Sequence, residues 1–499
     1  MNKIRKFANN LITPGGTLSQ RVVKSGFWVF FLRIFNQGFS LLRLIILARI
    51  LSPNDFGLMG IALLTMSILE TFSETGFQQA LIQKKEDIKS YLDNAWTVLI
   101  LRGFVLFVIL YFIAPYAAAF FNTPEAKPII RVIGFSILFQ AFTNIGITYF
   151  KKELEFNKEF IYQLTGTLAD FIVAISAVLI LRNVWALVFG SLASSITRCF
   201  VSYLIHPYRP RLNFTLEKVK ELFSFGKWVL GTNVLIFLII QGDDILVGKL
   251  LGTTALGFYQ LAYRISNLPA TEITHVISQV TFPTYSKLQD NIPKLREAYL
   301  KVLQFTTFLS FPIAGLIFVL APDFTKIFLG EKWMPMVPAM QVLCIFGVTR
   351  SINAIFGTFL QGIGKPAILT KATAIQLIVI IISIYPLTVK MGIIGTSLAV
   401  TLSNVFIMVY LFVKISYVME IKHISTIQTL QVSIFASIIM IIFYKIIKKY
   451  IIQMNIGIII GLVLMSVIFY FGFIFILDLF LHQGLIKKIK QSLGFFISI

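Results

Sequence analysis

Charged and amide side chains recur at helical spacing inside long apolar stretches of this 499-residue chain. The first stretch, residues 27–48, carries Arg33, Asn36, Gln37, Ser40 and Arg43. Steps of three and four residues put all five on one face of a helix. An ionisable side chain at mid-bilayer costs roughly 2.5–3.5 kcal/mol on insertion scales, so such a face normally meets a partner or a cavity. The pattern favours a water-filled cavity over contact with lipid.

Four other apolar stretches carry polar side chains in the same way. They hold Ser67, Glu70, Ser73 and Glu74 in residues 57–78, Gln241, Asp243 and Asp244 at the end of 223–242, Gln260, Arg264, Asn267, Thr271, Glu272, His275 and Ser278 in 254–281, and Arg350 and Asn353 in 336–361. Because these stretches come from both halves of the chain, we expect their polar faces to line one cavity. The candidates for ion coupling or gating are Glu70, Glu74, Asp55, Asp243, Asp244, Glu272 and His275. Histidine in particular changes charge near neutral pH.

The composition places these stretches in a membrane. Hydrophobic residues make up 57% of the chain and charged residues 13%, whereas soluble chains average about 45–50% and about 25%. This excludes a cytosolic enzyme, a secreted disulfide scaffold and a disordered tail. We expect an all-α polytopic membrane protein of about fourteen spans, each about 20 residues long. The predicted spans are 27–48, 57–78, 92–113, 130–150, 160–181, 184–205, 223–242, 254–281, 300–320, 336–361, 366–388, 392–413, 431–447 and 456–480.

The charges of the loops set the expected orientation. The net charge is +22, and the basic residues concentrate in one alternate set of loops. The positive-inside rule then places both termini in the cytoplasm, and it explains the charge without a nucleic-acid partner. Lys445, Lys448 and Lys449 are the exception, because this topology puts them outside. Either the thirteenth span is misplaced or the last hairpin tolerates the violation.

The remaining residue types indicate no cofactor and no metal. Cys199 and Cys344 fall within apolar stretches, and the four histidines lack the spacing of metal ligands. No nucleophile with a base and no phosphate-cradling glycine loop can be assembled. Residues 1–25 are basic without an apolar core, so we expect a cytoplasmic amphipathic segment at the membrane surface rather than a signal peptide.

An internal repeat organises the spans. Residues 26–62 align without a gap on residues 226–262, so that Trp28 and Gly57 coincide with Trp228 and Gly257. We expect two parallel six-helix lobes with a site at their interface, which is a transporter architecture. The predicted parts are the segment 1–25, an N-terminal lobe 26–207, a cytoplasmic linker 208–222, a C-terminal lobe 223–415, and two additional helices with a basic tail in 416–499.

Longer motifs resemble those of polysaccharide flippases in the multidrug/oligosaccharidyl-lipid/polysaccharide exporter superfamily, on the branch that includes the colanic acid exporter. The motifs are LARILSPNDFGLMGIA at 47–62, SETGFQQALIQKKE at 73–86, LGFYQLAYRISNLP at 256–269, FPTYSKLQDN at 282–291, APDFTKIFLGEKWMP at 321–335 and QGIGKP at 361–366. The resemblance implies two lobes that form a V around a cavity opening alternately to the two faces. It implies as substrate an undecaprenyl-pyrophosphate-linked oligosaccharide, moved to the outer leaflet of the bacterial inner membrane. A polysaccharide polymerase and a chain-length regulator are the implied protein partners.

Arginine suits such a substrate, because its planar fork grips phosphate oxygens, while amides bind sugar hydroxyls. The predicted binding residues are Arg43, Arg264, Arg33, Arg350, Asn36, Gln37, Asn267 and Gln260. Arg43 and Arg264 are the best pair to meet across the cavity, and both match arginines of related lipid II flippases. Asp55 and Glu74 match acidic positions there. Where those relatives place a further arginine in the second span, this chain has Leu69 and Glu70, so Arg33 or Arg350 would have to complete the phosphate clamp.

Most of these residues also have a structural interpretation, which the sequence leaves open. Arg49 and Lys249 lie near span ends and could reach the interface, and Asp55 follows Ser52-Pro53-Asn54 and could cap a helix. Arg33 could form an ion pair with Glu70 or Glu74 within one lobe, and Asp170 could form one with Arg198. His275 could be a packing residue, and Trp28 and Trp228 fit an interfacial belt.

Two other functions stay open at this point. An ion-coupled drug or metabolite antiporter of the same superfamily usually has twelve spans, which the two additional C-terminal spans disfavour. A polytopic polymerase of lipid-linked sugars would carry a sizeable extracytoplasmic loop, and none is visible in the sequence. We expect a transporter that is not an enzyme and that draws energy from an ion gradient, the membrane potential or consumption of its product.

Overall fold

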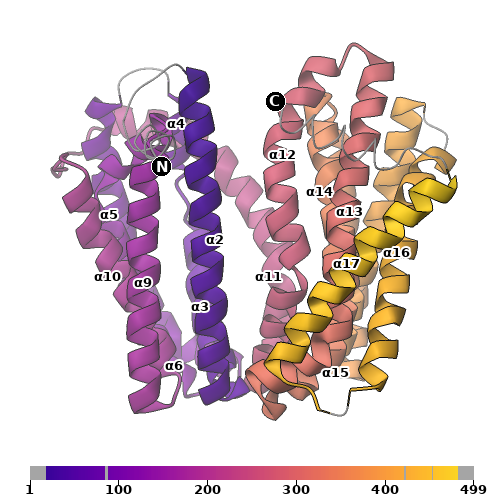
Figure 1. The fold of residues 1–499 in the computed structure, drawn as a ribbon. Coiled ribbons are helices and arrows are strands. Elements are labelled where there is room, and N and C mark those ends of the chain that lie inside the picture. Colours follow the sequence, from indigo (N-terminus) through magenta and orange to yellow (C-terminus); the bar gives the residue numbers. More distant parts are fainter. Residues whose placement is uncertain (1–17, 85–87, 421–422, 452, 482–499) are drawn as a thin grey trace, which may run out of the picture. The chain divides into compact units, whose positions relative to one another are not determined.

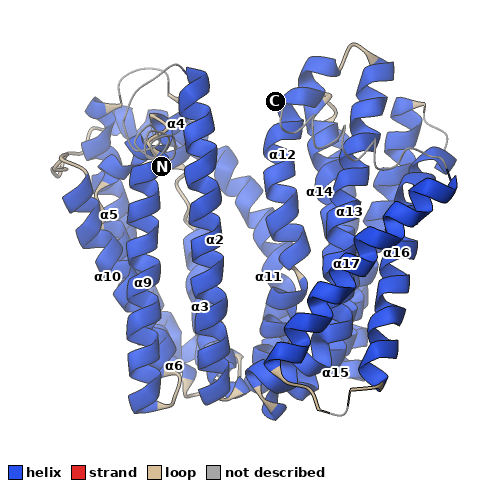
Figure 2. Cartoon of the chain, in the orientation of Figure 1, coloured by secondary structure: helices blue, strands red, loops and turns tan. Residues whose placement is uncertain are grey.

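The computed structural model describes residues 18–84, 88–420, 423–451 and 453–481. These residues form helices and their connections, with no strand among them (Figure 1, Figure 2). The prediction of an all-α membrane protein is therefore confirmed. The chain divides into two compact units, Met1–Gly257 and Phe258–Ile499.

The first unit combines long and short helices. Its long helices are α2 (Leu18–Ile50), α3 (Pro53–Phe72), α5 (Lys89–Phe120), α9 (Phe156–Leu181), α10 (Trp185–Ile205) and the part of α11 (Leu216–Ser266) that ends at Gly257. Its short elements are α4 (Phe77–Gln83), α6 (Ala126–Ile133), α7 (Phe135–Ala141), η1 (Ile145–Ile147) and α8 (Thr148–Lys152). Helix α9 packs against both α2 and α10 (Figure 1). Helix α9 is thus the neighbour of α2, which carries the first polar stripe, Arg33 to Arg43.

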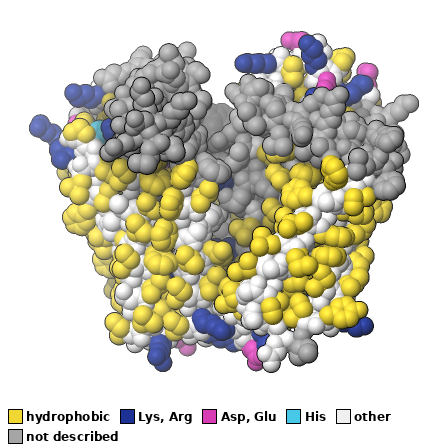
Figure 3. Space-filling model, viewed as in Figure 1, with side chains coloured by type: hydrophobic (Ala, Val, Ile, Leu, Met, Phe, Trp, Pro, Cys, Tyr) yellow, Lys and Arg dark blue, Asp and Glu magenta, His cyan; other side chains and the backbone are white. Residues whose placement is uncertain are grey.

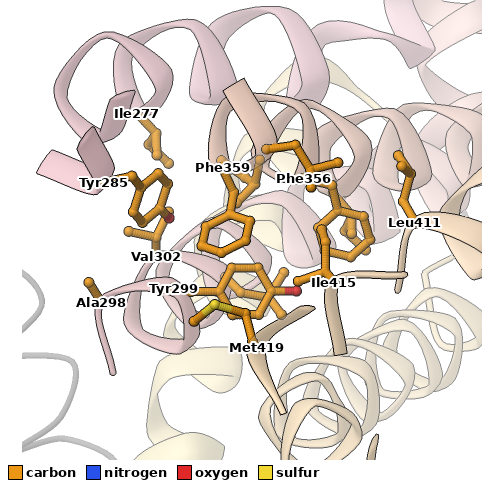
Figure 4. Packing of buried hydrophobic residues seen from close by; sticks show 14 of the residues in the cluster. Ile277, Tyr285, Ala298, Tyr299, Val302, Phe356, Phe359, Leu411, Ile415 and Met419 are labelled. Atoms are coloured by element: carbon orange, nitrogen blue, oxygen red, sulfur yellow. The ribbon is translucent and has the colours of Figure 1, made fainter. Parts of the chain in front are cut away.

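The second unit continues α11 and adds eight elements. They are α12 (Leu268–Leu288), α13 (Ile292–Phe324), η2 (Thr325–Leu329), η3 (Glu331–Met336), α14 (Val337–Gly362), α15 (Pro366–Met419), α16 (His423–Lys449) and α17 (Ile456–Leu481). Tyr285, Tyr299, Phe356 and Phe359 form the centre of its aromatic core (Figure 4). Their rings come from α12, α13 and α14, which binds these three helices to one another.

The backbone breaks at the same position in both copies of the repeat. Helix α2 ends at Ile50, and α3 begins at Pro53 after the N-cap Ser52. At the equivalent position 200 residues later, α11 is interrupted at Gly252, whose φ of 83° is left-handed. Glycine adopts this conformation without the steric cost that a side chain brings. The repeat found in the sequence therefore has a counterpart in the chain path.

Ten described helices are long and apolar enough to cross a membrane, or eleven with one bent pair. Helix α15 counts once, although Gly392 (φ 59°) breaks it between the predicted spans 366–388 and 392–413. The number of about fourteen spans stays a prediction. The span predicted over 130–150 is not one straight helix, because the chain bends by 69° between Ala126–Ala141 and Ile145–Lys152. Asn144 causes part of this break, since its side chain accepts the Gly146 N–H and starts η1.

Large apolar side chains point outward from the helices of both units. Ile180, Leu204 and Ile468 are 80%, 82% and 70% exposed. Hydrophobic side chains cover the sides of the described helices, while Lys and Arg gather at their ends (Figure 3). Exposing such an apolar surface is unfavourable in water but not in the hydrocarbon of a bilayer. The chain is a multi-pass membrane protein.

The two C-terminal helices pack on α13. Leu316 of α13 lies in one apolar cluster with Ala436 and Met440 of α16 and with Tyr470 of α17. At the last turn of α16, Lys448 Nζ lies 2.6 Å from Asp323 Oδ2. This ion pair offsets the charge of one of the three lysines that break the charge rule. The predicted thirteenth span, 431–447, does form a helix within α16.

Candidate functional site

The ion pair between Arg43 and Asp170 is the polar centre of the first unit. Nη2 of Arg43 in α2 lies 2.9 Å from Oδ1 of Asp170 in α9, and the two side chains are 20% and 23% exposed. Arg198 of α10, the partner considered from the sequence, lies beside Gly166 of α9, four residues before Asp170: a Cβ atom on Gly166 would come within 2.3 Å of the Arg198 Nε. The structure thus pairs Asp170 with the arginine that the sequence assigned to phosphate binding.

A second polar contact joins the same two helices. Thr167 of α9 donates its hydroxyl proton to Oδ1 of Asn36 at 2.9 Å. Phe39 and Phe171 add an edge-to-face contact with ring centroids 5.3 Å apart. In the same stripe Arg33 is half-buried and Gln37 is exposed. The polar face predicted for residues 27–48 therefore meets α9, at least at Asn36 and Arg43.

Arg102 of α5 is a buried cation that the sequence analysis passed over. Its Nη2 donates to the Glu70 carbonyl at 2.7 Å, and its Nε donates to the Ser73 carbonyl at 2.8 Å. The guanidinium satisfies carbonyls that the end of α3 leaves without helical partners. A basic residue in the middle of the predicted span 92–113 was the available signal.

The carboxylates predicted for coupling in this unit have local partners. Glu74 accepts from the side-chain amides of Gln79 at 3.2 Å and of Asn233 in α11 at 2.6 Å. Asp55 closes a capping box with Ser52, which is the structural interpretation of this residue. Asp243 is buried and Asp244 is half-buried within α11. Their roles in coupling stay predictions.

Lys249 lies just before the break of α11 at Gly252, and Arg49 lies at the end of α2. Lys249 Nζ donates to the Phe120 carbonyl at 2.6 Å and lies 4.9 Å from the centre of the Phe120 ring. A lysine that covers a helix C-terminus and an aromatic face keeps its charge near water. Arg49 is exposed in the last turn of α2.

In the second unit, a hydrogen bond joins Arg350, one of the predicted residues, to Tyr263. Arg350 Nη1 donates to the hydroxyl of Tyr263 at 3.1 Å, and Tyr263 precedes Arg264 in α11. Arg264 is exposed, Gln260 is half-buried and Asn267 is buried. Asn353 points elsewhere, because its Nδ2 donates to Oδ1 of Asn404 at 2.7 Å. The side chains of Glu272 and His275 lie outside the described residues.

The segment 206–215, here called the strap, follows α10 and is fixed to the first turns of α5. Asp93 accepts from the Tyr208 hydroxyl at 2.7 Å and from the Arg211 N–H at 2.8 Å. Thr215 N–H donates to Asn94 Oδ1 at 2.5 Å. No pattern in the sequence indicated that the first part of the predicted linker 208–222 would be hydrogen-bonded to a helix.

His206 begins the strap in an aromatic setting. Its ring stacks on Tyr149 with centroids 5.7 Å apart, and its Nδ1 accepts the Tyr208 N–H at 3.2 Å. Burial, and after it the charge of Lys158, lower the pKa of His206 below its ordinary value. Burial and the hydrogen bond to Asp93 raise the pKa of Tyr208. A neutral imidazole is the form that this contact requires.

Comparison with known proteins gives a family and a fold. The model of a family described as "Polysaccharide biosynthesis protein" matches residues 46–338. The lipopolysaccharide biosynthesis protein WzxC of Escherichia coli (strain K12) is 25% identical over 351 residues, which are 69% of this chain and 70% of that protein. The teichuronic acid biosynthesis protein TuaB of Bacillus subtilis (strain 168) is 29% identical over 298 residues, which are 58% of this chain and 61% of that protein.

Two solved structures share the fold. The lipid II flippase MurJ in an inward closed conformation superposes with a TM-score of 0.74 over 92% of this chain and 100% of that one, at 17% identity. An inward-facing multidrug resistance transporter of the MATE family gives a TM-score of 0.61 over 77% and 94%, also at 17% identity. At this identity the likeness concerns the fold.

Proposed function

We propose that this chain, which belongs to the polysaccharide biosynthesis protein family, moves a lipid-linked oligosaccharide across a membrane. The substrate is an oligosaccharide on undecaprenyl pyrophosphate, and the direction is from the cytoplasmic to the outer leaflet of the bacterial inner membrane. Relatives named for lipopolysaccharide and teichuronic acid biosynthesis support the substrate class. The fold shared with a lipid II flippase supports the type of movement.

The observation that carries the proposal is the guanidinium of Arg43 inside a candidate membrane span. Its Nε is buried and has no hydrogen-bond partner among the described residues. A buried unmet donor costs about 1–3 kcal/mol, so the position favours an oxygen-rich anion that completes its hydrogen bonds. Pyrophosphate is such an anion, and arginine binds phosphate oxygens in bidentate fashion.

In the transport cycle that we propose, Arg43, Arg264 and Arg350 bind the pyrophosphate of one head group. Asn36, Gln37, Gln260 and Asn267 bind sugar hydroxyls, and the lipid chain stays in the bilayer. The cavity then opens to the other face by rocking of the two lobes. Both termini are placed in the cytoplasm, and the chain transports without catalysing a covalent step.

An ion-coupled antiporter is the weaker alternative. The multidrug transporter superposes less well than the flippase, and the two helices α16 and α17 follow the twelve spans of the repeat. They pack on α13 as an integral part of the second unit. No observation in the described part of the chain favours a polymerase.

Complementation tests the proposed function. The gene is placed in a bacterial strain that lacks its own flippase for a surface polysaccharide, and the surface polymer and the lipid-linked intermediate are measured together. Restored polymer with cleared intermediate is the expected result. A well-expressed protein that clears no intermediate in strains carrying several different repeat units would contradict the proposal.

A further inference from the structure

The contact between Arg43 and Asp170 uses only part of the hydrogen-bonding capacity of the arginine. A guanidinium carries five N–H donors in a fixed fork, and the ion pair engages Nη2, 2.9 Å from one carboxylate oxygen. Nε of the same side chain is buried and meets no acceptor among the described residues. A bidentate arrangement would have engaged both sides of the fork. The pair is therefore an incomplete one.

The two helices do not depend on this ion pair for their contact. Asn36 and Thr167 form a hydrogen bond of 2.9 Å about two turns away along α2. Aromatic contacts of Trp28 with Phe160 and of Phe39 with Phe171, at 5.1 and 5.3 Å between centroids, flank it. The ion pair can therefore open while α2 and α9 stay together.

A glycine on the neighbouring helix leaves space for the Asp170 carboxylate. A Cβ atom on Gly190 of α10 would come within 2.6 Å of Oδ1 of Asp170. Any larger residue at position 190 would displace the carboxylate, because real Cβ atoms do not approach so closely. Asp170 thus lies where Gly190 leaves room for its carboxylate, beside the arginine predicted to bind phosphate.

An arginine inside a membrane is energetically costly unless it has a counter-ion. A bound phosphate can serve as this counter-ion only while substrate is present, so the empty site needs another one. We propose that Asp170 is the internal counter-ion of Arg43, which the phosphate group of the substrate displaces. The inference rests on the proposed function and adds a positioning residue to it. Asp170 keeps the guanidinium in place when the site is empty and weakens the binding of the anion, so that the anion can leave again.

Binding of an anionic probe tests this role. Inorganic pyrophosphate is titrated calorimetrically into the full-length protein in lipid nanodiscs. Asp170→Asn removes the competing charge and is expected to tighten binding about tenfold, or about 1.4 kcal/mol. A purely structural residue would not improve binding when replaced. Asp170→Ser is also expected to tighten pyrophosphate binding, and it is the variant to test if Asp170→Asn does not fold.

The matched control is Glu159→Gln on the same helix. Glu159 is also buried, and its partners are Gln163 at 2.9 Å and Lys151 at 3.9 Å rather than Arg43. This variant is expected to bind pyrophosphate as the parent protein does. Arg43→Ala is expected to abolish binding in both the parent and the Asp170→Asn background.

Two results would overturn the counter-ion role. One is unchanged or weaker binding by a folded Asp170→Asn or Asp170→Ser protein, and the other is binding that does not depend on Arg43. With successful complementation by the parent protein, either result leaves the flippase proposal in place and removes only this inference. Failure of the parent protein to clear intermediate removes the flippase proposal itself.

Discussion

Gly57 of α3 packs directly on the backbone of Thr253 of α11, so that a Cβ atom on the glycine would lie 1.8 Å from the Thr253 carbonyl oxygen. The repeat makes this contact reciprocal. Gly257, the equivalent of Gly57, lies against Pro53, the equivalent of Thr253, at 2.0 Å by the same measure. The Thr253 side chain also hydrogen-bonds to Asn54. The two copies of the repeat thus meet within the first unit through matching glycines.

Replacing Gly57 by alanine is expected to destabilise the protein by about 1–3 kcal/mol, as overpacking of a close contact does. The methyl group meets backbone, which cannot rotate away. Thermal unfolding of the purified protein measures the effect. Gly38→Ala in α2 is the matched control, because nothing lies within 4 Å of a Cβ atom there. Equal unfolding temperatures for the two variants would show that the close contact is absent.

The ion pair between Lys448 and Asp323 is expected to hold α16 against α13. Lys448→Met should lower stability by about 1 kcal/mol, since the lysine side chain is 36% exposed and water screens the pair. Lys449→Met, at an exposed position one residue further on, removes the same charge and should have no effect. Thermal unfolding of the two variants in parallel is the measurement. An equal loss for the two variants would mean that total charge, rather than the pair, matters.

The strap is expected to loosen in acid because of His206. Its folded-state pKa lies below the ordinary value of 6.5, so burying the neutral ring stabilises the strap above that pH. As the pH falls through the folded-state pKa, the ring takes up a proton, and the hydrogen bond from the Tyr208 N–H is lost. Lys158 and Arg209 then repel the new charge, while Glu155 attracts it.

Hydrogen exchange of residues 206–215 measures this effect. Exchange, corrected for its intrinsic pH dependence, should be faster at a pH well below 6.5, the ordinary pKa of histidine, than at a pH above it. In His206→Gln the same amides should exchange at a rate independent of pH between these two values. A parent protein whose strap is protected equally at both pH values would rule out the histidine as the cause.

Arg264 is expected to be necessary for transport. Arg264→Ala should leave the protein in the membrane and abolish export, because the proposed site loses one of the guanidinium groups that bind the pyrophosphate. Surface polymer in the complemented strain, normalised to membrane-inserted protein, is the readout. Arg182→Ala, which removes an exposed arginine at the end of α9, is the control and should export normally. Full export by Arg264→Ala would remove this residue from the site.

The features that could be predicted from the sequence are those that depend on periodicity and on the spacing of residues close in the chain. The polar stripe from Arg33 to Arg43, the helices of the spans and the cap at Asp55 all depend on residues close in the chain. The repeat offset also predicted that Gly57 and Gly257 are equivalent positions, and the structure adds that they make equivalent contacts.

Partners distant in the chain could not be predicted in this way. The sequence offered Arg198 as a partner of Asp170, and only the packing of α2 on α9 shows that Arg43 lies beside it. Arg102 is recognisable as a helix cap only once α5 lies beside the end of α3. The bend after residue 141 depends in part on the Asn144 side chain, which apolar composition does not reveal.

Translocation itself is the most direct test of the central claim. The purified protein is reconstituted into vesicles with lipid-linked oligosaccharide taken from a strain that lacks its flippase. A membrane-impermeant oxidant of sugar diols then reports how much of the oligosaccharide is accessible from outside. The account predicts that the lumenal pool becomes accessible in vesicles with the parent protein and stays protected with Arg43→Ala. The account would be contradicted if the lumenal oligosaccharide stayed inaccessible to the oxidant in vesicles that contain well-folded parent protein, under every ion gradient and membrane potential applied.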